Sequence, residues 1–387
     1  SNDGALFYSD YQEIRQGKKI HHPTLEYQTG SIRNDFDFGQ LLLFRNDSFQ
    51  QVVAQMNTDY RFAALYELRL SISRLGKIVH IPETLYTVQP TDLRLSGEKQ
   101  FDYVDPANRE VQLEMEAVCT AHLQAIGAWL APEFQRIDFG QENFAREASV
   151  IIPVRNRKRT IAEAVESALQ QQTDFSFNVI VVDNHSTDGT GQILTELSRR
   201  YPNLIHHIPA STELGIGGCW TEAILLPECG KFAIQLDSDD LYKDCHVLQR
   251  IVDTFYQENC AMVIGSYQMV DFKLEEIPPG LIAHREWTPD NGRNNALRIN
   301  GLGAPRAFYT PVLRQIKFPN VSYGEDYATA LAISRKYPIA RIYDPLYLCR
   351  RWEENSDHDL DIQQLNNYNF YKDKIRTLEI QARISGK

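Results

Sequence analysis

Three aspartates separated by a single serine follow an apolar run in "KFAIQLDSDDLYKD", at Asp237, Asp239 and Asp240. Carboxylates this close repel one another, since two unit charges about 4 Å apart interact by about 4 kcal/mol at an effective dielectric of about 20. A divalent cation removes that repulsion, and Mg²⁺ and Mn²⁺ prefer oxygen ligands, including those of phosphates. Most isolated Asp-x-Asp pairs are solvated turn residues. At the end of an apolar run, however, the cluster predicts a site for Mn²⁺ or Mg²⁺.

An alternation of apolar runs and helical patterns places these aspartates at the edge of a sheet. Runs typical of buried strands cover residues 148–154, 178–183, 204–208, 231–236 and 261–267. Helical patterns cover residues 159–172, 186–201, 219–226 and 246–257. This order predicts a doubly wound α/β fold with a mostly parallel sheet. Such sheets bind ligands at the carboxyl ends of their strands, so Asp183 and Asp237, which both end a predicted strand, are candidate ligand contacts.

Length and composition narrow the class of protein. The 387 residues favour two domains, and 43% hydrophobic with 24% charged residues is ordinary for a globular chain. A formal net charge of −11 argues against a nucleic-acid partner. No apolar run is long enough to span a bilayer, no secretory leader is visible, and the six scattered cysteines favour neither zinc nor disulfides. These features predict a cytoplasmic location.

The first part of the chain also echoes the last part. Three pairs of segments match: 72–86 with 333–347 at a constant shift of 261 positions, 7–13 with 235–241, and 41–52 with 304–316. We interpret them as an internal duplication whose first copy lacks its front half, with chance similarity of helix-turn-strand units as the alternative. The predicted domains are a partial copy at residues 1–105, a helical linker at 106–146 and a complete domain at 147–387.

Four segments in order resemble the motifs of family-2 glycosyltransferases, which have the GT-A fold. The segments are "VIIPVRNRKRTIAEAVESALQQQ", "VIVVDNHSTDGT", "IQLDSDDLY" and "YGEDYATALAISRKYPIARIYDPLYLCR". The resemblance covers residues 148–358, and residues 6–90 in truncated form as a repeat of the fold's second half. It implies metal-dependent, inverting transfer of a hexosyl group from a nucleotide-diphosphate sugar, a UDP-sugar being favoured. The implied acceptor is a hydroxyl of a glycan or glycolipid in bacterial surface polysaccharide synthesis.

The resemblance also implies a donor site. Pro153, Val154 and Arg155 match the loop that borders the nucleotide base, and Asp183 matches the aspartate that accepts the uracil N–H. A helix N-cap is the plainer role for Asp183, although Ser186 and Asp188 suit that cap better. The implied metal ligands are Asp237, Asp239 and His358, and the implied donor contacts are Asp237, Asp240 and Arg351, with Arg350 as the alternative to Arg351. A lone histidine in a polar loop such as His358 is more often solvated.

On the acceptor side the resemblance implies an acidic pair. Asp326 would deprotonate the acceptor hydroxyl, and Glu325 would orient the acceptor. The plainer alternative is that both carboxylates only complement the positive end of the helix that they begin.

Departures from the family pattern keep other functions open. Trp220 and Thr221 stand where relatives often carry Arg-Asn, and Ala64-Leu65 stands opposite the acidic pair in the first copy, which we expect to be inactive. The alternatives are a non-catalytic glycan- or nucleotide-binding module and a nucleotidyltransferase of related fold, although "PVRNRKRT" lacks the glycines of a phosphate loop. A homodimer and peripheral association with a membrane-bound acceptor at the inner membrane also stay open.

Overall fold

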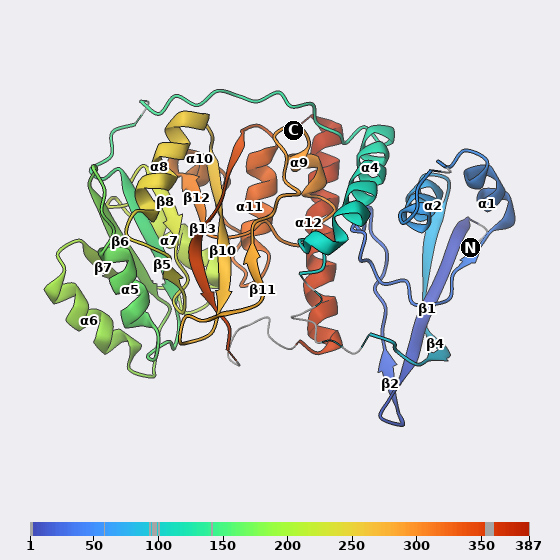
Figure 1. Cartoon of the computed structure of the whole chain (residues 1–387), viewed down its shortest axis with the longest axis horizontal. Helices are drawn as coiled ribbons and strands as arrows, with labels where there is room; N and C mark the ends of the chain where they lie inside the picture. Colours follow the sequence, from blue (N-terminus) through green and yellow to red (C-terminus); the bar gives the residue numbers. More distant parts are fainter. Residues whose placement is uncertain are drawn as a thin grey trace. The chain divides into compact units, whose positions relative to one another are not determined.

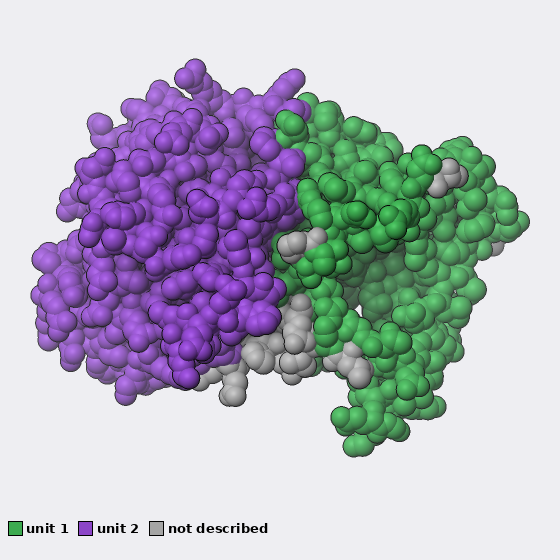
Figure 2. All heavy atoms as spheres, viewed as in Figure 1, with its two compact units in different colours: residues 1–131, 290–300, 354–387 green, residues 132–289, 301–353 purple. Residues whose placement is uncertain are grey.

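The computed structural model describes residues 3–57, 59–92, 94, 99, 101–140, 142–352 and 360–386. The chain divides into two compact units, which Figure 2 colours separately. Unit 1 comprises residues 1–131, 290–300 and 354–387, and unit 2 comprises residues 132–289 and 301–353. This division differs from the boundaries expected at residues 105 and 146, because residues 290–300 and the C-terminal helix are part of unit 1.

Unit 2 is an α/β unit whose strands and helices alternate through most of its length (Figure 1). Its strands are β5 (Ala148–Val154), β6 (Phe177–Asp183), β7 (Leu204–His207), β8 (Phe232–Gln235), β9 (Leu241–Tyr242), β10 (Met262–Val270), β11 (Glu276–Ile282), β12 (Arg306–Tyr309) and β13 (Ile339–Arg350). Its helices are α5 (Ile161–Leu169), α6 (Thr190–Arg200), α7 (Ile216–Leu225), α8 (Val247–Glu258), α10 (Thr310–Ile316) and α11 (Glu325–Ser334).

The unit 2 strands form one mixed sheet in the order β7-β6-β5-β8-β12-β10-β13-β9, with β11 paired to β10. The prediction of a mostly parallel sheet is confirmed for β7, β6, β5 and β8, which are parallel neighbours. It is wrong for the second half, which is mixed: β12 runs antiparallel to both β8 and β10, whereas β10 and β13 are parallel. A short turn joins β10 to β11, and parallel neighbours need a longer crossover, so this pair is antiparallel too.

The parallel half of the sheet is built from continuously apolar strands. In β5 every residue except Pro153 is buried, and β6 is buried from Asn178 to Asp183. Such runs are typical of strands covered on both faces. Since Val154 pairs with Asp183 in the last register position, the loops after β5 and β6 leave the sheet side by side.

Hydrogen bonds hold those two loops together. The Asn156 amide donates to the Ser186 hydroxyl (2.9 Å), and the Asn156 side chain accepts from the Thr187 amide (2.8 Å). The Lys158 amide donates to Asp188, which also accepts from the amide of Thr190, the first residue of α6. Residues 186–189 are therefore loop, and α6 begins four residues later than its sequence pattern predicts.

Unit 1 has its own small sheet and several helices. The strands are β1 (Gly4–Arg15), β2 (Lys18–His22), β3 (Leu43–Phe44) and β4 (Lys77–Val88). The helices are α1 (Asn46–Val53), α2 (Ala64–Ser73), the 3-10 helix η1 (Pro106–Asn108), α4 (Arg109–Ala125), α9 (Gly292–Asn295) and α12 (Ile362–Ser385). Strand β1 pairs antiparallel with β2 and β3 and parallel with β4. None of the helices in the described ranges combines the length and hydropathy needed to cross a lipid bilayer.

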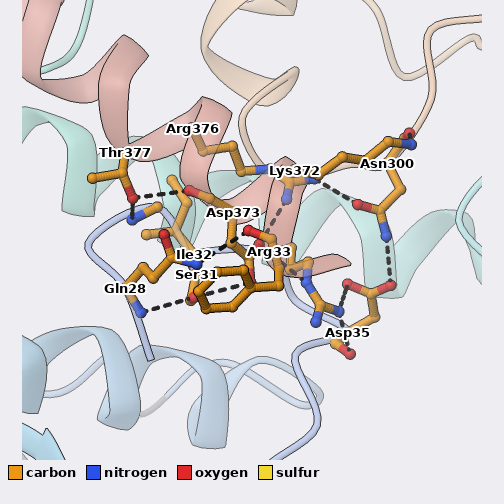
Figure 3. Close-up of polar contacts among 12 residues, drawn as sticks. Gln28, Ser31, Ile32, Arg33, Asp35, Asn300, Lys372, Asp373, Arg376 and Thr377 are labelled. Carbon is orange, nitrogen blue, oxygen red and sulfur yellow. Dashed lines mark hydrogen bonds and ion pairs between the residues drawn. The ribbon is translucent and has the colours of Figure 1, made fainter. Parts of the chain in front are cut away.

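A buried polar network attaches α12 to the rest of unit 1 (Figure 3). Asp373, 1% exposed, accepts from the Ser31 hydroxyl (2.9 Å), from Arg33 (3.2 Å) and from Arg376 (2.8 Å). Arg376 also donates to the Asn300 side chain (2.6 Å). At Gly30 a Cβ would lie 2.2 Å from the Asp373 carbonyl oxygen, so only glycine fits there. The C-terminal helix is thus an integral part of the N-terminal unit.

Candidate functional site

The aspartate cluster lies directly after β8, at the carboxyl end of the parallel half of the sheet. The Asp237 amide donates to the Tyr347 hydroxyl (2.8 Å), and Asp240 accepts from the Arg350 amide (2.7 Å). Asp239 faces Arg157 (3.6 Å) and accepts from the Trp352 indole (3.2 Å). Contacts from the loop after β5 and from the end of β13 therefore converge on the three carboxylates.

Burial and mutual repulsion disfavour the ionised forms of Asp237 and Asp240. Burial raises the pKa of Asp237 above its ordinary value, with Asp239 adding to the rise and Arg306 opposing it. Burial, followed by the charges of Asp239 and Asp237, raises the pKa of Asp240 well above its ordinary value. Both shifts mean that a nearby positive charge would stabilise the ionised cluster.

The acidic pair lies in the first turn of α11. Asp326 forms an ion pair with Arg306, and Arg306 Nε also donates to Gln235 Oε1 (3.0 Å). Gln235 in turn donates through Nε2 to Asp237 Oδ1 (2.9 Å). A continuous series of side-chain contacts therefore joins the acidic pair to the aspartate cluster.

Glu325 differs from its neighbour in environment. It is 8% exposed, and its Oε2 is buried without a hydrogen-bond partner among the described residues. Burial, followed by the charge of Asp326, raises the pKa of Glu325 to about 8. At neutral pH Glu325 is therefore largely protonated, while Asp326 is paired with a guanidinium group. The two carboxyl groups of the pair are suited to different tasks.

Asp183 lines a hollow to which residues of α6 and β7 also contribute. The hollow has a volume of about 580 Å³, and its lining includes Asp183, His185, Gln192, Arg199 and His206. Asp183 accepts from the Ser186 amide (2.9 Å) and lies 3.4 Å from His206 Nε2. Burial would raise the pKa of Asp183, but these hydrogen bonds outweigh it and hold the pKa below its ordinary value. Asp183 is thus a buried, ionised acceptor, and Asp188 instead contacts the start of α6.

The remaining predicted residues are distributed around the same end of the sheet. Pro153 and Val154 end β5, and Arg155 follows them on the surface. The Arg351 amide donates to the Val270 carbonyl (2.9 Å), whereas the buried Arg350 side chain donates to the Asp239 carbonyl and pairs with Glu163. His358 lies outside the described residues.

The aspartate cluster fits a metal ion that is bound by few protein ligands together with substrate oxygens. Within the part of the chain that the structure describes, no three histidine, cysteine, aspartate or glutamate side chains are grouped to hold a metal ion. Mg²⁺ is commonly bound by only one or two carboxylates together with substrate phosphates. The oxygen-only set at Asp237 and Asp239, whose charge calls for a counterion, fits such a cation.

Sequence reasoning missed three side chains that the structure places in the site: Gln235, Arg306 and Tyr347. A signal existed for Gln235, because it is a polar residue inside an apolar run and lies two residues before Asp237. Arg306 also carried a signal, being a charge inside the apolar segment "APRAFY". Trp220, in contrast, is 5% exposed and packs against Phe308 and Phe318, so its role is in the core.

Part of the chain is similar in sequence to known glycosyltransferases. Residues 149–316 match the model of glycosyl transferase family 2. A poly(ribitol-phosphate) beta-glucosyltransferase of Bacillus spizizenii is 24% identical over 58% of this chain and 35% of its own length. A Bacillus subtilis glycosyltransferase named for teichuronic acid biosynthesis is 26% identical over 50% of this chain and 74% of its own.

Among solved structures, S. aureus TarS 1-349 in complex with UDP has 22% identity and a TM-score of 0.46, covering 60% of this chain and 65% of that one. The chain spans 37% of the length of an uncharacterised glycosyltransferase of Nostoc and 35% of the B. spizizenii enzyme, so it corresponds to about a third of these relatives. The family match covers both the loop after β5 and the aspartate cluster. Residues 149–316 of this chain are a glycosyltransferase family 2 domain.

Proposed function

We propose that unit 2 is a GT-A-type domain that catalyses metal-dependent, inverting transfer of a sugar from a nucleotide-diphosphate donor to a hydroxyl group. The observation that carries the proposal is the contact series from Asp326 through Arg306 and Gln235 to Asp237. This series links the acidic pair of α11 to the aspartate cluster after β8, which supports a single site that contains both. The family match of residues 149–316 supports the same activity.

The donor side would use the carboxyl ends of β5, β6 and β8. Asp183 would accept an N–H of the base, next to Pro153, Val154 and Arg155. Asp237 and Asp239 would hold Mn²⁺ or Mg²⁺, which when bound supplies Lewis-acid stabilisation of a departing diphosphate. Asp240 and Arg351 would complete the donor contacts, and His358 is a further proposed metal ligand.

The acceptor side would use the acidic pair. Asp326 would take the proton of the acceptor hydroxyl while that oxygen attacks the anomeric carbon on the face opposite the departing diphosphate, which inverts the configuration. Glu325, largely protonated at neutral pH, would donate a hydrogen bond that orients the acceptor. The names of the two Bacillus relatives favour a surface polymer as acceptor. We propose UDP-sugars as the first donors to test. Peripheral association with a membrane-bound acceptor and a homodimer remain part of this proposal.

We also propose that unit 1 repeats the second half of the unit 2 fold. In unit 1, β1 pairs antiparallel with β2 and β3 and parallel with β4. In unit 2, β10 pairs in the same way with β11, β12 and β13. Two helices precede the last strand in each case, α1 and α2 before β4 and α10 and α11 before β13. The shared order of elements and pairings supports a duplication.

These pairings favour a revised alignment of the first strand. Tyr11 pairs with Tyr86, and Tyr267 pairs with Tyr347, which is Tyr86 shifted by 261 positions. Residues 7–13 then correspond to β10 rather than to residues 235–241. On this alignment unit 1 has no counterpart of the aspartate cluster, and Ala64-Leu65 replaces the acidic pair. Unit 1 would therefore bind or position an acceptor rather than catalyse.

The test of the activity is release of the nucleotide diphosphate from a panel of UDP- and GDP-sugars with Mn²⁺. We expect one donor to be consumed, the reaction to stop with EDTA, and Asp239→Asn to lose it. The exposed Asp174 supplies the control, since Asp174→Asn changes the same chemical group elsewhere in unit 2. If no donor is consumed with or without candidate acceptors and none stabilises the protein thermally with Mn²⁺, the proposed transfer is wrong and a non-catalytic, glycan-binding role is favoured.

A further inference from the structure

Arg306 occupies a central electrostatic position in unit 2. It is the first residue of β12, which lies between β8 and β10. Burial alone would lower the pKa of Arg306, but the charges of Asp326, Asp237 and Glu325 raise it above its ordinary value. One guanidinium group thus interacts with carboxylates on both sides of the proposed reaction centre.

Gln235 fixes how that guanidinium is oriented. Gln235 is 3% exposed, and its Oε1 accepts from both the amide (3.1 Å) and the Nε (3.0 Å) of Arg306. Two donors on one oxygen leave no choice of amide orientation, so Nε2 must face Asp237, to which it donates at 2.9 Å. With Nε engaged by Gln235, Nη1 of Arg306 is directed at Asp326.

These contacts fix a direction as well as satisfying donors. A buried guanidinium needs hydrogen-bond acceptors whatever its role, but an acceptor on Nε from the buried Gln235 also sets the orientation of the whole group. The guanidinium offers its donors in a rigid fork, so fixing Nε fixes the direction of the Nη1–H bond as well. A carboxylate that acts as a general base must be held within hydrogen-bond reach of the hydroxyl that it deprotonates.

We propose that Arg306 is a positioning residue for Asp326, and that Gln235 positions Arg306 and thereby couples Asp326 to Asp237. The inference rests on the proposed transfer reaction and adds two residues to it. Neither residue needs to touch the substrate: Arg306 orients the carboxylate that receives the proton, and Gln235 sets the angle of the guanidinium.

The test compares Arg306→Lys and Gln235→Met with the wild type. Lysine keeps the charge but lacks the fork, and methionine keeps the size of glutamine but can neither accept from Arg306 nor donate to Asp237. Arg314→Lys is the matched control, because Arg314 donates to the carbonyls of Ile224 (2.8 Å) and Leu226 (3.4 Å) in the same unit. The measurements are kcat for transfer and the Kd of UDP with Mn²⁺ by calorimetry.

We expect kcat to fall at least tenfold in both variants while the Kd stays within threefold, and the control to change neither. A kcat within threefold of the wild type in both variants overturns the proposal. A parallel loss of kcat and of UDP affinity also overturns it, because the residues would then be structural.

A second measurement does not depend on turnover, so it separates this inference from the proposed function. Unfolding constants of Arg306→Gln, Asp326→Asn and the double variant give the coupling between the two side chains, in the wild type and in a Gln235→Met background. We expect a coupling of at least tenfold that drops below threefold without Gln235. An undiminished coupling without Gln235 overturns the role of the glutamine, whether or not a donor is ever consumed.

Discussion

Replacing Glu325 by glutamine should stabilise the protein, and more so as the pH rises. Glu325 is buried, and its pKa is raised from 4.5 to about 8, first by burial and then by the charge of Asp326. Between these two values the folded state holds a proton that the unfolded state has released. The free energy of unfolding therefore falls as the pH rises through this window. Glutamine has the shape of the protonated acid and does not titrate. The free energy of unfolding of Glu325→Gln should therefore not contain this pH-dependent decrease.

The magnitude follows from the pKa difference. A rise from 4.5 to about 8 corresponds to about 5 kcal/mol at about 1.36 kcal/mol per unit. Water that enters around the ionised group recovers part of this, so we expect a gain of about 2–3 kcal/mol at pH 8. The gain should be about 1 kcal/mol at pH 6 and should vanish near pH 4.5. The raised carboxyl group of Asp240 is present in both proteins and cancels in the difference, whereas the charge of Asp237 contributes to the raised pKa of Glu325 itself.

The assay is urea unfolding followed by tryptophan fluorescence from pH 5 to pH 8.5, with EDTA present to exclude bound metal. Glu228→Gln is the control, because Glu228 is exposed in the same unit. We expect its stability to track the wild type at every pH. A Glu325→Gln variant whose stability difference from the wild type stays constant across this range would refute the reasoning, since Glu325 would then not titrate in the window.

Three further substitutions test other parts of the structure. Asp373→Ala should destabilise the protein by about 3 kcal/mol in urea unfolding, because it leaves the buried guanidinium groups of Arg33 and Arg376 without their carboxylate. A loss below about 1 kcal/mol would show that the fold does not need this network. Tyr347→Phe should cost about 1 kcal/mol by the same assay, since it removes the acceptor of the Asp237 amide; unchanged stability would mean that water replaces the hydroxyl. Asp183→Asn should weaken UDP binding about tenfold in calorimetry and leave Mn²⁺ binding unchanged, because one hydrogen bond to a charged group is worth about 1.5–3 kcal/mol. Equal UDP affinity would show that Asp183 does not contact the nucleotide base.

The first half of unit 2 was predictable because its strands are local, apolar and parallel. Strand β5 has the predicted bounds, 148–154, and β6 ends at the predicted Asp183. Helix α6 begins at Thr190 rather than at the predicted residue 186, and the helical periodicity of the sequence does not explain this difference. The side chains of Asp183 and Asn156 accept from the amides of Ser186 and Thr187 and so keep them out of the helix. The contact between Asn156 and Thr187 joins residues 31 positions apart.

The second half was harder to predict because its pairings join distant segments. Strand β12 lies beside β8, although some 70 residues separate them in sequence. Only that pairing brings Arg306 next to Gln235, so the contact series to Asp326 could not be inferred from spacing. The assignment of α12 to unit 1 likewise depends on contacts between residues near 30 and residues near 373, which leave no periodic signature in the chain.

Asp326→Asn and Asp239→Asn, each assayed for UDP binding with Mn²⁺ and for turnover of the donor and acceptor, separate the two proposed roles. The carboxylate of Asp326 would act at the acceptor, and that of Asp239 at the metal. Asp326→Asn should bind UDP like the wild type but lose at least about 100-fold in kcat, as expected for a missing general base. Asp239→Asn should lose both binding and turnover. Near-normal turnover by Asp326→Asn, with UDP binding intact, would show that Asp326 is not the base.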